Sequence, residues 1–290
     1  MRLHFNFLLL GLFASVMIST AQETIDENDL FMNLVRQVRA PSFNIKTLDK
    51  VYQTAYIDKT NLKISINTIS PSKKALTRPE LYKSKAPQVY RFVKVFRDDS
   101  GQLIIENIAT AFPISEDGYF CMNYHMAELF GVGSGIPASL DSVEHYFLAD
   151  YAGNIVTIDS ICSYNQQADV AIVKADTKGQ KITAFALGDD LQTGDDVFII
   201  AHPKAYLYYF STGMINRFTQ QGNNIYSRKM EIAADYAGGS SGGPIFDSKG
   251  NIAGMVSLTQ SFYYHQKEQR SLQMVVKQAV PVSVIKALIK

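Results

Sequence analysis

Three segments of the chain hold residue types that together could carry out hydrolysis through an activated serine. His125 follows the apolar run YFCM (119–122), and Asp169 directly precedes the apolar run VAIV (170–173). Ser241 lies in the glycine-rich stretch GGSSGGP (238–244). A serine hydroxyl is a poor nucleophile until an imidazole takes its proton, and a buried carboxylate orients that imidazole and stabilises its charged form. The pattern therefore predicts a triad of His125 as general base, Asp169 as its orienting acid and Ser241 as nucleophile.

The glycines around Ser241 suggest a second part of the same chemistry. An oxyanion hole needs backbone N–H groups that point at the developing negative charge, with no Cβ atom obstructing the substrate. The N–H groups of Gly239 and Ser241 are the candidate donors. Each donor of this kind stabilises the transition state by roughly 2.7–4 kcal/mol.

The elements that must position these residues are short strands. From about residue 86 onward, apolar segments alternate with turn signals such as DDSG (98–101) and DSKGN (247–251). This pattern favours an all-β barrel or sandwich over alternating β/α units. The expected strands are 88–97, 102–115, 119–124, 143–149, 154–164, 170–175, 196–201, 208–218, 229–234, 244–247, 252–258 and 271–281, and a helix is expected over 282–289.

Residues 1–21 have the pattern of a secretory signal peptide. Arg2 precedes a 14-residue apolar run over 5–18, and small residues precede a cleavage point after Ala21. The run is shorter than the ~20 residues that span a bilayer, and the alternative is a buried or anchoring helix. No other segment reaches 18 apolar residues, so the mature chain is expected to have no membrane span and to be exported, to a periplasm or out of the cell.

Residues 22–85 differ from the strand-rich remainder and form an expected N-terminal α+β extension. Apolar residues at Leu30, Phe31, Leu34 and Val38 predict a helix over 26–39. A strand is expected over 63–69 and a short helix over 79–84. Two roles remain open for this extension: a propeptide that keeps the site latent, or a segment that packs on the domain formed by 86–290.

Composition excludes several classes of protein. With 28 Lys+Arg against 27 Asp+Glu, the formal net charge is +1, which argues against nucleic acid as a partner. The two cysteines cannot form a four-cysteine metal site, and no calcium or zinc ligand spacing is present. Export would permit a disulfide between Cys121 and Cys162, but two separate core thiols fit the sequence as well.

In this order, the segments resemble the trypsin-like serine proteases, and among these most closely the HtrA-type bacterial branch. The resemblance covers about residues 80–290 and is carried by ISEDGYFCMNYHMAE (114–128), ADVAIVKAD (168–176), GSSGGPIFD (239–247) and KQAVPVSVIKALI (277–289). It implies two antiparallel six-stranded β-barrels of chymotrypsin type, with His125 and Asp169 on the first and Ser241 on the second. It also implies a serine endopeptidase that acts on peptides or proteins through an acyl-enzyme and needs no cofactor.

The resemblance also suggests residues of the substrate pocket. Asp235, six residues before Ser241, would lie at the pocket floor, and Lys277 would border the same pocket. A free Asp235 would favour Lys or Arg before the scissile bond, and a free Lys277 would favour acidic residues. We hypothesise that the two pair, which neutralises the charge and makes the preference apolar or weak. Ser257 would support the triad aspartate, and Leu258 and Thr259 would run antiparallel to bound peptide.

Two departures limit what the resemblance implies. Ser240 stands where trypsin has an aspartate that pairs with a freshly cut N-terminus, so activation by that ion pair is not expected. No PDZ-like segment is recognisable after the protease segment.

Other interpretations of the same residues are weaker. The G-x-S-x-G pattern also occurs in α/β-hydrolases, but their acid and histidine follow the serine, and only 49 residues follow Ser241 here. His145 is expected in a cross-strand role and His202 in a turn, whereas His265 could line the cleft. The rival function is a protease-like binding protein whose occluded cleft holds partners without cutting them.

Overall fold

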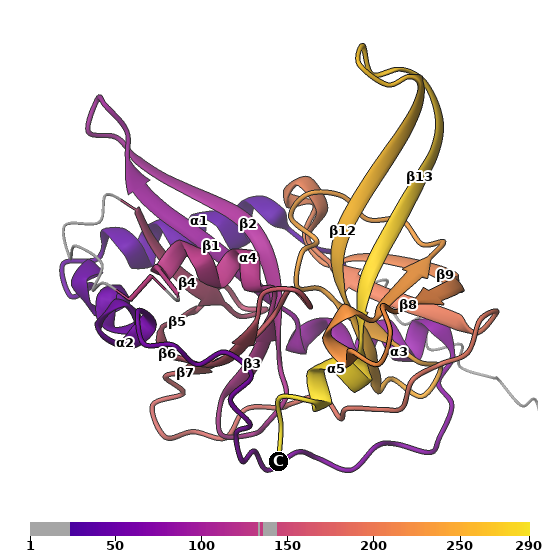
Figure 1. Cartoon of the computed structure of the whole chain (residues 1–290). Helices are drawn as coiled ribbons and strands as arrows, with labels where there is room; N and C mark the ends of the chain where they lie inside the picture. The colour runs from indigo at the N-terminus through magenta and orange to yellow at the C-terminus, as the bar shows by residue number, and fades with distance from the viewer. Residues whose placement is uncertain (1–23, 133, 136–143) are drawn as a thin grey trace, which may run out of the picture.

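The computed structural model describes residues 24–132, 134–135 and 144–290. Two bodies of antiparallel strands lie side by side, and a two-stranded hairpin projects from the second (Figure 1). The predicted signal peptide, residues 1–21, lies outside the described residues. The all-β prediction of chymotrypsin type is confirmed, with helices limited to short segments at the periphery.

The first body is a seven-stranded sheet in the order β5-β4-β1-β2-β3-β7-β6. The strands at its two ends, β5 and β6, are separated in the chain by Thr157 alone, so one bent strand joins the edges and the sheet curls into a barrel. Counted in this way, the barrel has six strands. Its strands are β1 (Tyr90–Arg97), β2 (Leu103–Pro113), β3 (Tyr119–Met122), β4 (Glu144–Ala149), β5 (Ile155–Val156), β6 (Ile158–Asn165) and β7 (Val170–Ala175).

The second body is a closed six-stranded barrel in the order β10-β13-β12-β11-β8-β9. Alternating apolar side chains fill it, among them the fully buried Ile215, Met230 and Ile245. Its strands are β8 (Asp196–Ala201), β9 (Tyr209–Thr219), β10 (Lys229–Ile232), β11 (Pro244–Phe246), β12 (Ile252–His265) and β13 (Arg270–Pro281).

The helices are short. The predicted helix over 26–39 is present as α1, which begins after Asp26, whose side chain accepts a hydrogen bond from Asp29 N. The helices expected over 79–84 and 282–289 are also present, the second shorter than predicted. The α-helices are α1 (Glu27–Arg39), α2 (Tyr52–Ala55), α3 (Arg78–Lys85), α4 (Tyr124–Ala127) and α5 (Val282–Lys286), and the 3₁₀ helices are Ile45–Val51, Ala86–Gln88, Glu128–Phe130, Pro203–Ala205 and Ile225–Ser227.

Two predicted strands were wrong in extent. The strand expected over 252–258 continues to His265 as β12, seven residues further. The strand expected over 63–69 is absent, and in that range only Ile64 forms a bridge, with Ile289. This single bridge does not extend into a ladder of paired residues, so no strand forms. The segment runs along the lower side of both barrels (Figure 1).

The described part of the N-terminal extension, residues 24–85, packs on both barrels. Leu34 of α1 and Leu48 lie with Val93 and Phe147 in a buried cluster against β1 and β4. Further on, Leu81 of α3 is fully buried in the large core cluster that contains residues of both barrels. Removing such side chains from a core costs a few kcal/mol each, so this segment contributes to the stability of the fold.

The two cysteines do not form a disulfide. Cys121 is fully buried beside Met255, whose sulfur lies 3.7 Å from its own, and Cys162 lies partly buried on β6. Burial raises the pKa of the Cys121 thiol, which keeps it protonated and unreactive. Of the two possibilities that the sequence left open, the structure shows separate thiols. None of the described helices has the length and apolar character needed to cross a bilayer.

Candidate active site

A pocket with a volume of about 560 Å³ lies where the two barrels meet. The first barrel contributes His125 and Asp169, and the second contributes Ser241. The three predicted triad residues therefore lie in one pocket, although they are distant in sequence. The full lining is Tyr124, His125, Glu128, Gln166, Asp169, Lys229, Tyr236, Ala237, Gly238, Ser241, Val256, Ser257, Leu258, Thr259 and Gln278.

His125 is held by the short helix α4 directly after β3. Its backbone N–H donates to Asp169 Oδ1 at 3.1 Å, and its Nδ1 lies 2.8 Å from the same oxygen. Because a carboxylate can only accept, Nδ1 carries the proton and the Nε2 lone pair of the neutral ring remains available. The fully buried Asn123, which precedes the helix, donates from Nδ2 to Asp169 O at 3.0 Å.

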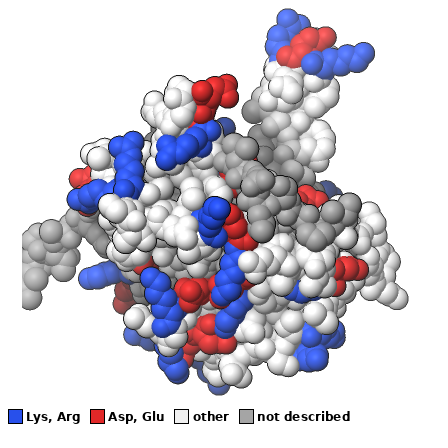
Figure 2. All heavy atoms as spheres, turned by 90° about the vertical axis from the view of Figure 1, so that its left-hand side faces the viewer, with Lys and Arg blue, Asp and Glu red and all other residues white. Residues whose placement is uncertain are grey.

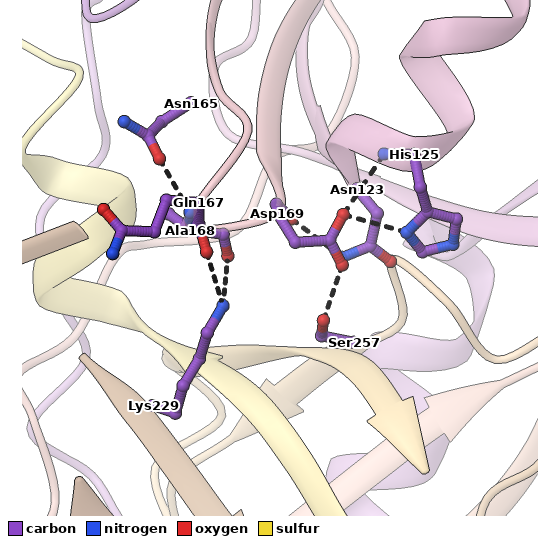
Figure 3. A network of polar contacts seen from close by, with 8 residues as sticks. All are labelled: Asn123, His125, Asn165, Gln167, Ala168, Asp169, Lys229 and Ser257. Atoms are coloured by element: carbon purple, nitrogen blue, oxygen red, sulfur yellow. Dashed lines mark hydrogen bonds and ion pairs between the residues drawn. The ribbon is translucent and has the colours of Figure 1, made fainter. Parts of the chain in front are cut away.

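Asp169 has a left-handed backbone conformation, with φ of +61°. Aspartate tolerates this region better than most residues, and here the conformation follows a turn in which Asp169 N donates to Gln166 O at 3.0 Å. Its second carboxylate oxygen, Oδ2, accepts from Ser257 Oγ at 2.5 Å. Both oxygens are therefore engaged, and the carboxylate is fixed toward His125 (Figure 3).

Lys229 of β10 forms hydrogen bonds to the turn that carries Asp169. Its Nζ donates to Gln167 O and Ala168 O, both at 3.0 Å, while Asn165 Oδ1 accepts from Ala168 N at 2.7 Å (Figure 3). Burial lowers the pKa of the Lys229 ammonium group from its usual 10.5, and the nearby Asp169 charge partly offsets this. A side chain of the second barrel thus positions the acid of the first.

The loop that carries Ser241 is tied to β2 of the first barrel. Thr110 N donates to Ser241 O at 2.8 Å, and Thr110 Oγ1 donates to Gly239 O at 3.0 Å. Gly242 has φ of +80°, and a Cβ there would lie 2.1 Å from Thr110 O. Only glycine permits this approach, so the loop's glycines set the distance between nucleophile and first barrel.

The predicted oxyanion donors are free. Neither Gly239 N nor Ser241 N donates a hydrogen bond within the described part of the chain. Gly239 has φ of +94°, and a Cβ there would lie 2.4 Å from His202 O. The segment after β8 therefore supports the loop from behind and leaves both N–H groups unused.

The side chains of His125 and Ser241 line the same pocket, but among the described residues no hydrogen bond joins them. Hydrogen bonds of this kind are often long or poorly aligned without substrate and tighten when it binds. His125 and Asp169 are thus already paired, whereas a contact between the predicted base and the predicted nucleophile would form only when substrate binds.

The structure places Asp235 and Lys277 apart from this pocket. Asp235 Oδ1 and Lys277 Nζ form an ion pair at 2.8 Å, as the sequence suggested, but they line a separate hollow beside Met274 and Val275. The sequence places both residues at the primary pocket, whereas Lys277 faces away from the hollow that Ser241 lines, because successive residues of β13 face opposite sides. Gln278, the next residue, lines the catalytic pocket.

Tyr236 is one of several pocket residues that sequence reasoning missed. It is largely buried, and its hydroxyl lies 3.0 Å from Leu258 O and 2.9 Å from Gln278 O. The ring therefore bridges the strands on two sides of the pocket and places an uncharged surface there. The sequence feature that could have indicated Tyr236 is its position directly after Asp235, at the start of the loop leading to Ser241.

The other histidines within the described residues lie outside the pocket. His145 Nδ1 lies 2.6 Å from Asp49 Oδ1 in the N-terminal extension, and His265 lies near the end of the β12–β13 hairpin. His202 is fully buried behind the Ser241 loop, and its Nδ1 accepts from Tyr208 N at 3.0 Å. No group of three His, Cys, Asp or Glu side chains within the described ranges could hold a metal ion.

Acid is expected to destabilise the fold through His202. Burial, aided by the charge of Arg91, lowers the pKa of His202 from 6.5 to about 3. Above pH 6.5 the ring is neutral in both states, but as the pH falls below 6.5 the unfolded chain binds a proton that the folded chain excludes. Between pH 7.5 and 4.5, the free energy of unfolding should fall by about 3 kcal/mol more in the wild type than in His202→Asn.

Urea unfolding of both proteins at the two pH values measures this difference. Asparagine retains an acceptor for the Tyr208 N–H group but does not titrate. An equal pH dependence in the two proteins would show that His202 does not cause the loss.

Comparison with known proteins gives one matching family model, described as the trypsin-like peptidase domain, over residues 109–255. "Protease Do-like 5, chloroplastic" of Arabidopsis thaliana is 27% identical over 167 residues, which are 53% of this chain and 49% of that protein. "Probable periplasmic serine endoprotease DegP-like" of Chlamydia muridarum is 28% identical over 148 residues, which are 50% of this chain and 27% of that protein. The matches thus cover about half or less of these relatives.

Solved structures show the same fold at lower identity. "HtrA-type protease AlgW with decapeptide" has a TM-score of 0.54 at 17% identity, covering 73% of this chain and 66% of that one. "Crystal structure of Deg5" has a TM-score of 0.52 at 18% identity, covering 72% of this chain and 93% of that one. At these identities the similarity establishes the fold alone.

Proposed function

The chain belongs to the family of trypsin-like peptidase domains, and on that premise we propose that it is an exported serine endopeptidase. One observation carries the proposal: His125, Asp169 and Ser241 line one pocket, with the acid already bonded to the histidine. We propose that these three are the catalytic residues, that the substrate is a peptide or protein and that no cofactor takes part. The naming of relatives as serine endoproteases supports this reaction.

The first step is attack of Ser241 Oγ on the scissile carbonyl carbon. His125 Nε2 takes the hydroxyl proton, and Asp169 stabilises the resulting imidazolium through Nδ1. Ser257, which donates to Asp169 Oδ2, and Asn123, which donates to Asp169 O, keep the acid in place. We therefore propose positioning roles for Ser257 and Asn123.

The second step is collapse of the tetrahedral intermediate. The N–H groups of Gly239 and Ser241 bind its oxyanion, and His125 returns the proton to the leaving amine. Water then attacks the acyl-enzyme on Ser241 with His125 as base again, which releases the acid product and restores the hydroxyl.

The primary pocket is proposed to favour apolar side chains. Tyr236 presents its ring there, and the charge of Asp235 is compensated by Lys277 in a separate hollow. The Asp235 carboxylate is therefore not offered to a basic substrate side chain, and the Lys229 ammonium group that lines the pocket is already bonded to Gln167 O and Ala168 O. Peptide-library profiling would contradict this if cleavage clustered after charged residues.

Export and the role of the extension complete the proposal. The sequence pattern of residues 1–21 and the word periplasmic in a relative's name support export. The described residues of the extension pack on the barrels, and none of them lines the pocket. This supports a packing role over that of a propeptide that occupies the site.

Covalent labelling tests the proposed function. The folded 22–290 chain is treated with a fluorophosphonate probe, and the labelled peptide is mapped by mass spectrometry. We expect one adduct, on Ser241, because only a serine with a base and an oxyanion hole reacts readily with this reagent. The urea-unfolded chain is the matched control, since it contains the same serines without their arrangement.

Both possible failures are informative. Equal labelling of folded and unfolded chains would mean that Ser241 is not activated. No labelling of well-folded protein would favour the protease-like binding protein with an occluded cleft.

A further inference from the structure

The β12–β13 hairpin extends well beyond the barrel to which it belongs. Within the barrel, β12 also pairs with β11 over 252–255, and β13 also pairs with β10 over 277–279. Farther out, the two strands pair only with each other among the described residues, from Gln260 opposite Val276 to His265 opposite Arg270. The result is an isolated two-stranded ribbon that stands out from the body (Figure 1).

One face of this ribbon is apolar and begins at the catalytic pocket. Residues directly opposite each other in an antiparallel pair share a face, and every second residue along a strand does so too. Leu258 and Gln278, which form the first pair, both line the catalytic pocket. By the alternation along both strands, the pairs Gln260 with Val276 and Phe262 with Met274 follow on the same side, and Met274 also lines the separate hollow of Asp235 and Lys277. We call Leu258, Phe262, Met274 and Val276 the pocket face.

The pocket face exposes large apolar side chains. Leu258 is 53% exposed, Phe262 42% and Met274 56%. Contiguous apolar side chains left in water on a projecting element usually mark a binding surface. The tip of the ribbon carries Lys267, Glu268 and Arg270, so charged groups end the apolar surface there (Figure 2). Charges of both signs at the tip argue against insertion into lipid and for a polypeptide occupant.

The backbone edge of β12 limits how such an occupant could bind. Beyond Ser257 this edge has no strand partner in the described part of the chain. Farther out, the Gln266 side chain covers it: Tyr263 N donates to Gln266 Oε1 at 2.9 Å, and Gln266 Nε2 lies 3.5 Å from Ser261 O. A bound peptide can therefore add as a strand only next to the pocket, and contacts farther out must come from side chains.

We propose that the pocket face binds an extended, apolar segment of the substrate on the N-terminal side of the scissile bond. The inference rests on the proposed protease function and names the substrate class of that site. β12 leads away from Ser241, so a substrate strand antiparallel to it has its N-terminal residues farthest from Ser241. Phe262 lies four residues beyond Leu258, roughly 13 Å along a strand. Substrate residues about four positions upstream of those in the pocket would therefore meet Phe262 and Met274.

The test compares peptides that differ only upstream of the cleaved bond. After library profiling has identified a cleavable core, three quenched fluorescent peptides are made around it. One is a twelve-residue peptide with Leu and Phe at five to eight positions before the bond, one carries Ser at those positions, and one is short and ends before them. We expect wild-type kcat/KM to be about tenfold higher for the apolar than for the serine peptide, mostly through KM.

The variant that tests the surface is Phe262→Ser/Met274→Ser. In this variant, the ratio of kcat/KM for the apolar peptide to kcat/KM for the serine peptide should fall to about one. Turnover of the short peptide should stay unchanged. The control, Val275→Ser, changes an exposed apolar side chain opposite Ser261 on the other side of the same ribbon and should keep the preference. The apolar peptide should also bind the inactive Ser241→Ala protein about tenfold more weakly when the pocket-face changes are added.

Several outcomes would overturn the proposal. One is an unchanged preference for the apolar peptide in the pocket-face variant, and another is an equal loss of that preference in the control variant. The third is an equal loss of kcat/KM for long and short peptides, together with a changed molecular mass in light scattering. The last would make this face a contact between copies of the chain. Failure of the protease function is separate, because it would appear as absent fluorophosphonate labelling, whereas peptide binding to Ser241→Ala would still report on the surface.

Discussion

Replacing Ser241 with alanine is expected to lower kcat for every cleavable peptide by about 10⁶-fold. Alanine removes the oxygen that forms the acyl-enzyme, and the remaining oxyanion donors and binding contacts supply only a small part of the rate enhancement. The fold should persist, because the loop is held by backbone atoms: Thr110 bonds to Ser241 O and Gly239 O, neither of which the substitution removes.

Active protein and variant are compared by steady-state kinetics with a profiled peptide, and folding is checked by circular dichroism. Ser248→Ala is the matched control, since Ser248 is exposed and lies only seven residues away in sequence. A folded Ser241→Ala protein that keeps even one hundredth of the wild-type rate would remove Ser241 from the nucleophile's role.

Replacing Asp169 with asparagine is expected to lower kcat by about 10⁴-fold. The amide is nearly the same size as the carboxylate, but it has no charge to stabilise the imidazolium and can present an N–H group to His125 Nδ1. Nδ1 would then accept and the proton would lie on Nε2, which is the wrong tautomer for taking the proton of Ser241. Ser257 and Asn123 would still hold the side chain and backbone, so the loss comes from chemistry rather than misfolding.

Separate measurement of kcat and KM distinguishes this effect from simple disruption. If Asp169 acts through the tautomer and charge of His125, KM should change far less than kcat. Asp189→Asn is the control, because the Asp189 side chain is 99% exposed and does not line the pocket. A variant with less than a tenfold loss in kcat would show that Asp169 is dispensable for orienting the base.

Local patterns in the sequence were sufficient to predict most strands and the residues of the site. Burial of alternate side chains leaves a period of two in the sequence, so the strands of both barrels were predictable to within a few residues. His125 and Asp169 were conspicuous because each adjoins such a strand, at the end of β3 and the start of β7. The glycines beside Ser241 are similarly local, since a φ of +94° at Gly239 favours that residue type.

The outer part of β12 could not be predicted, for an equally physical reason. Residues 259–265 are exposed to various degrees on both faces, so no alternation of buried and exposed positions marks them in the sequence. They form a strand because β13 pairs with them. Their partner residues lie beyond a turn of charged and polar residues, so this pairing leaves no periodicity in the local sequence. The extended apolar surface next to the pocket was therefore invisible before the fold was known.

The positions of Asp235 and Lys277 show the same limit at the scale of one residue. The resemblance suggested that Lys277 borders the pocket, but the register of β13 turns it away and directs Gln278 inward. A shift by one residue moves a side chain to the opposite face, and β12 has a bulge at Ser257, between Val256 and Leu258. The spacing of residues in the sequence does not show where such bulges occur, so it does not show which side chains face the pocket.

By itself, the sequence determined which residue types are present, their order and their places at the ends of strands. That was enough to predict His125, Asp169 and Ser241 as a group. Only the tertiary structure decided that they meet, because His125 and Asp169 are 44 residues apart and come together through the pairing of β3 with β7. Ser241 joins them through the packing of two barrels, in which Thr110 and Lys229 bridge the bodies. Contacts between segments so distant in the chain depend on the whole fold, and no local pattern records them.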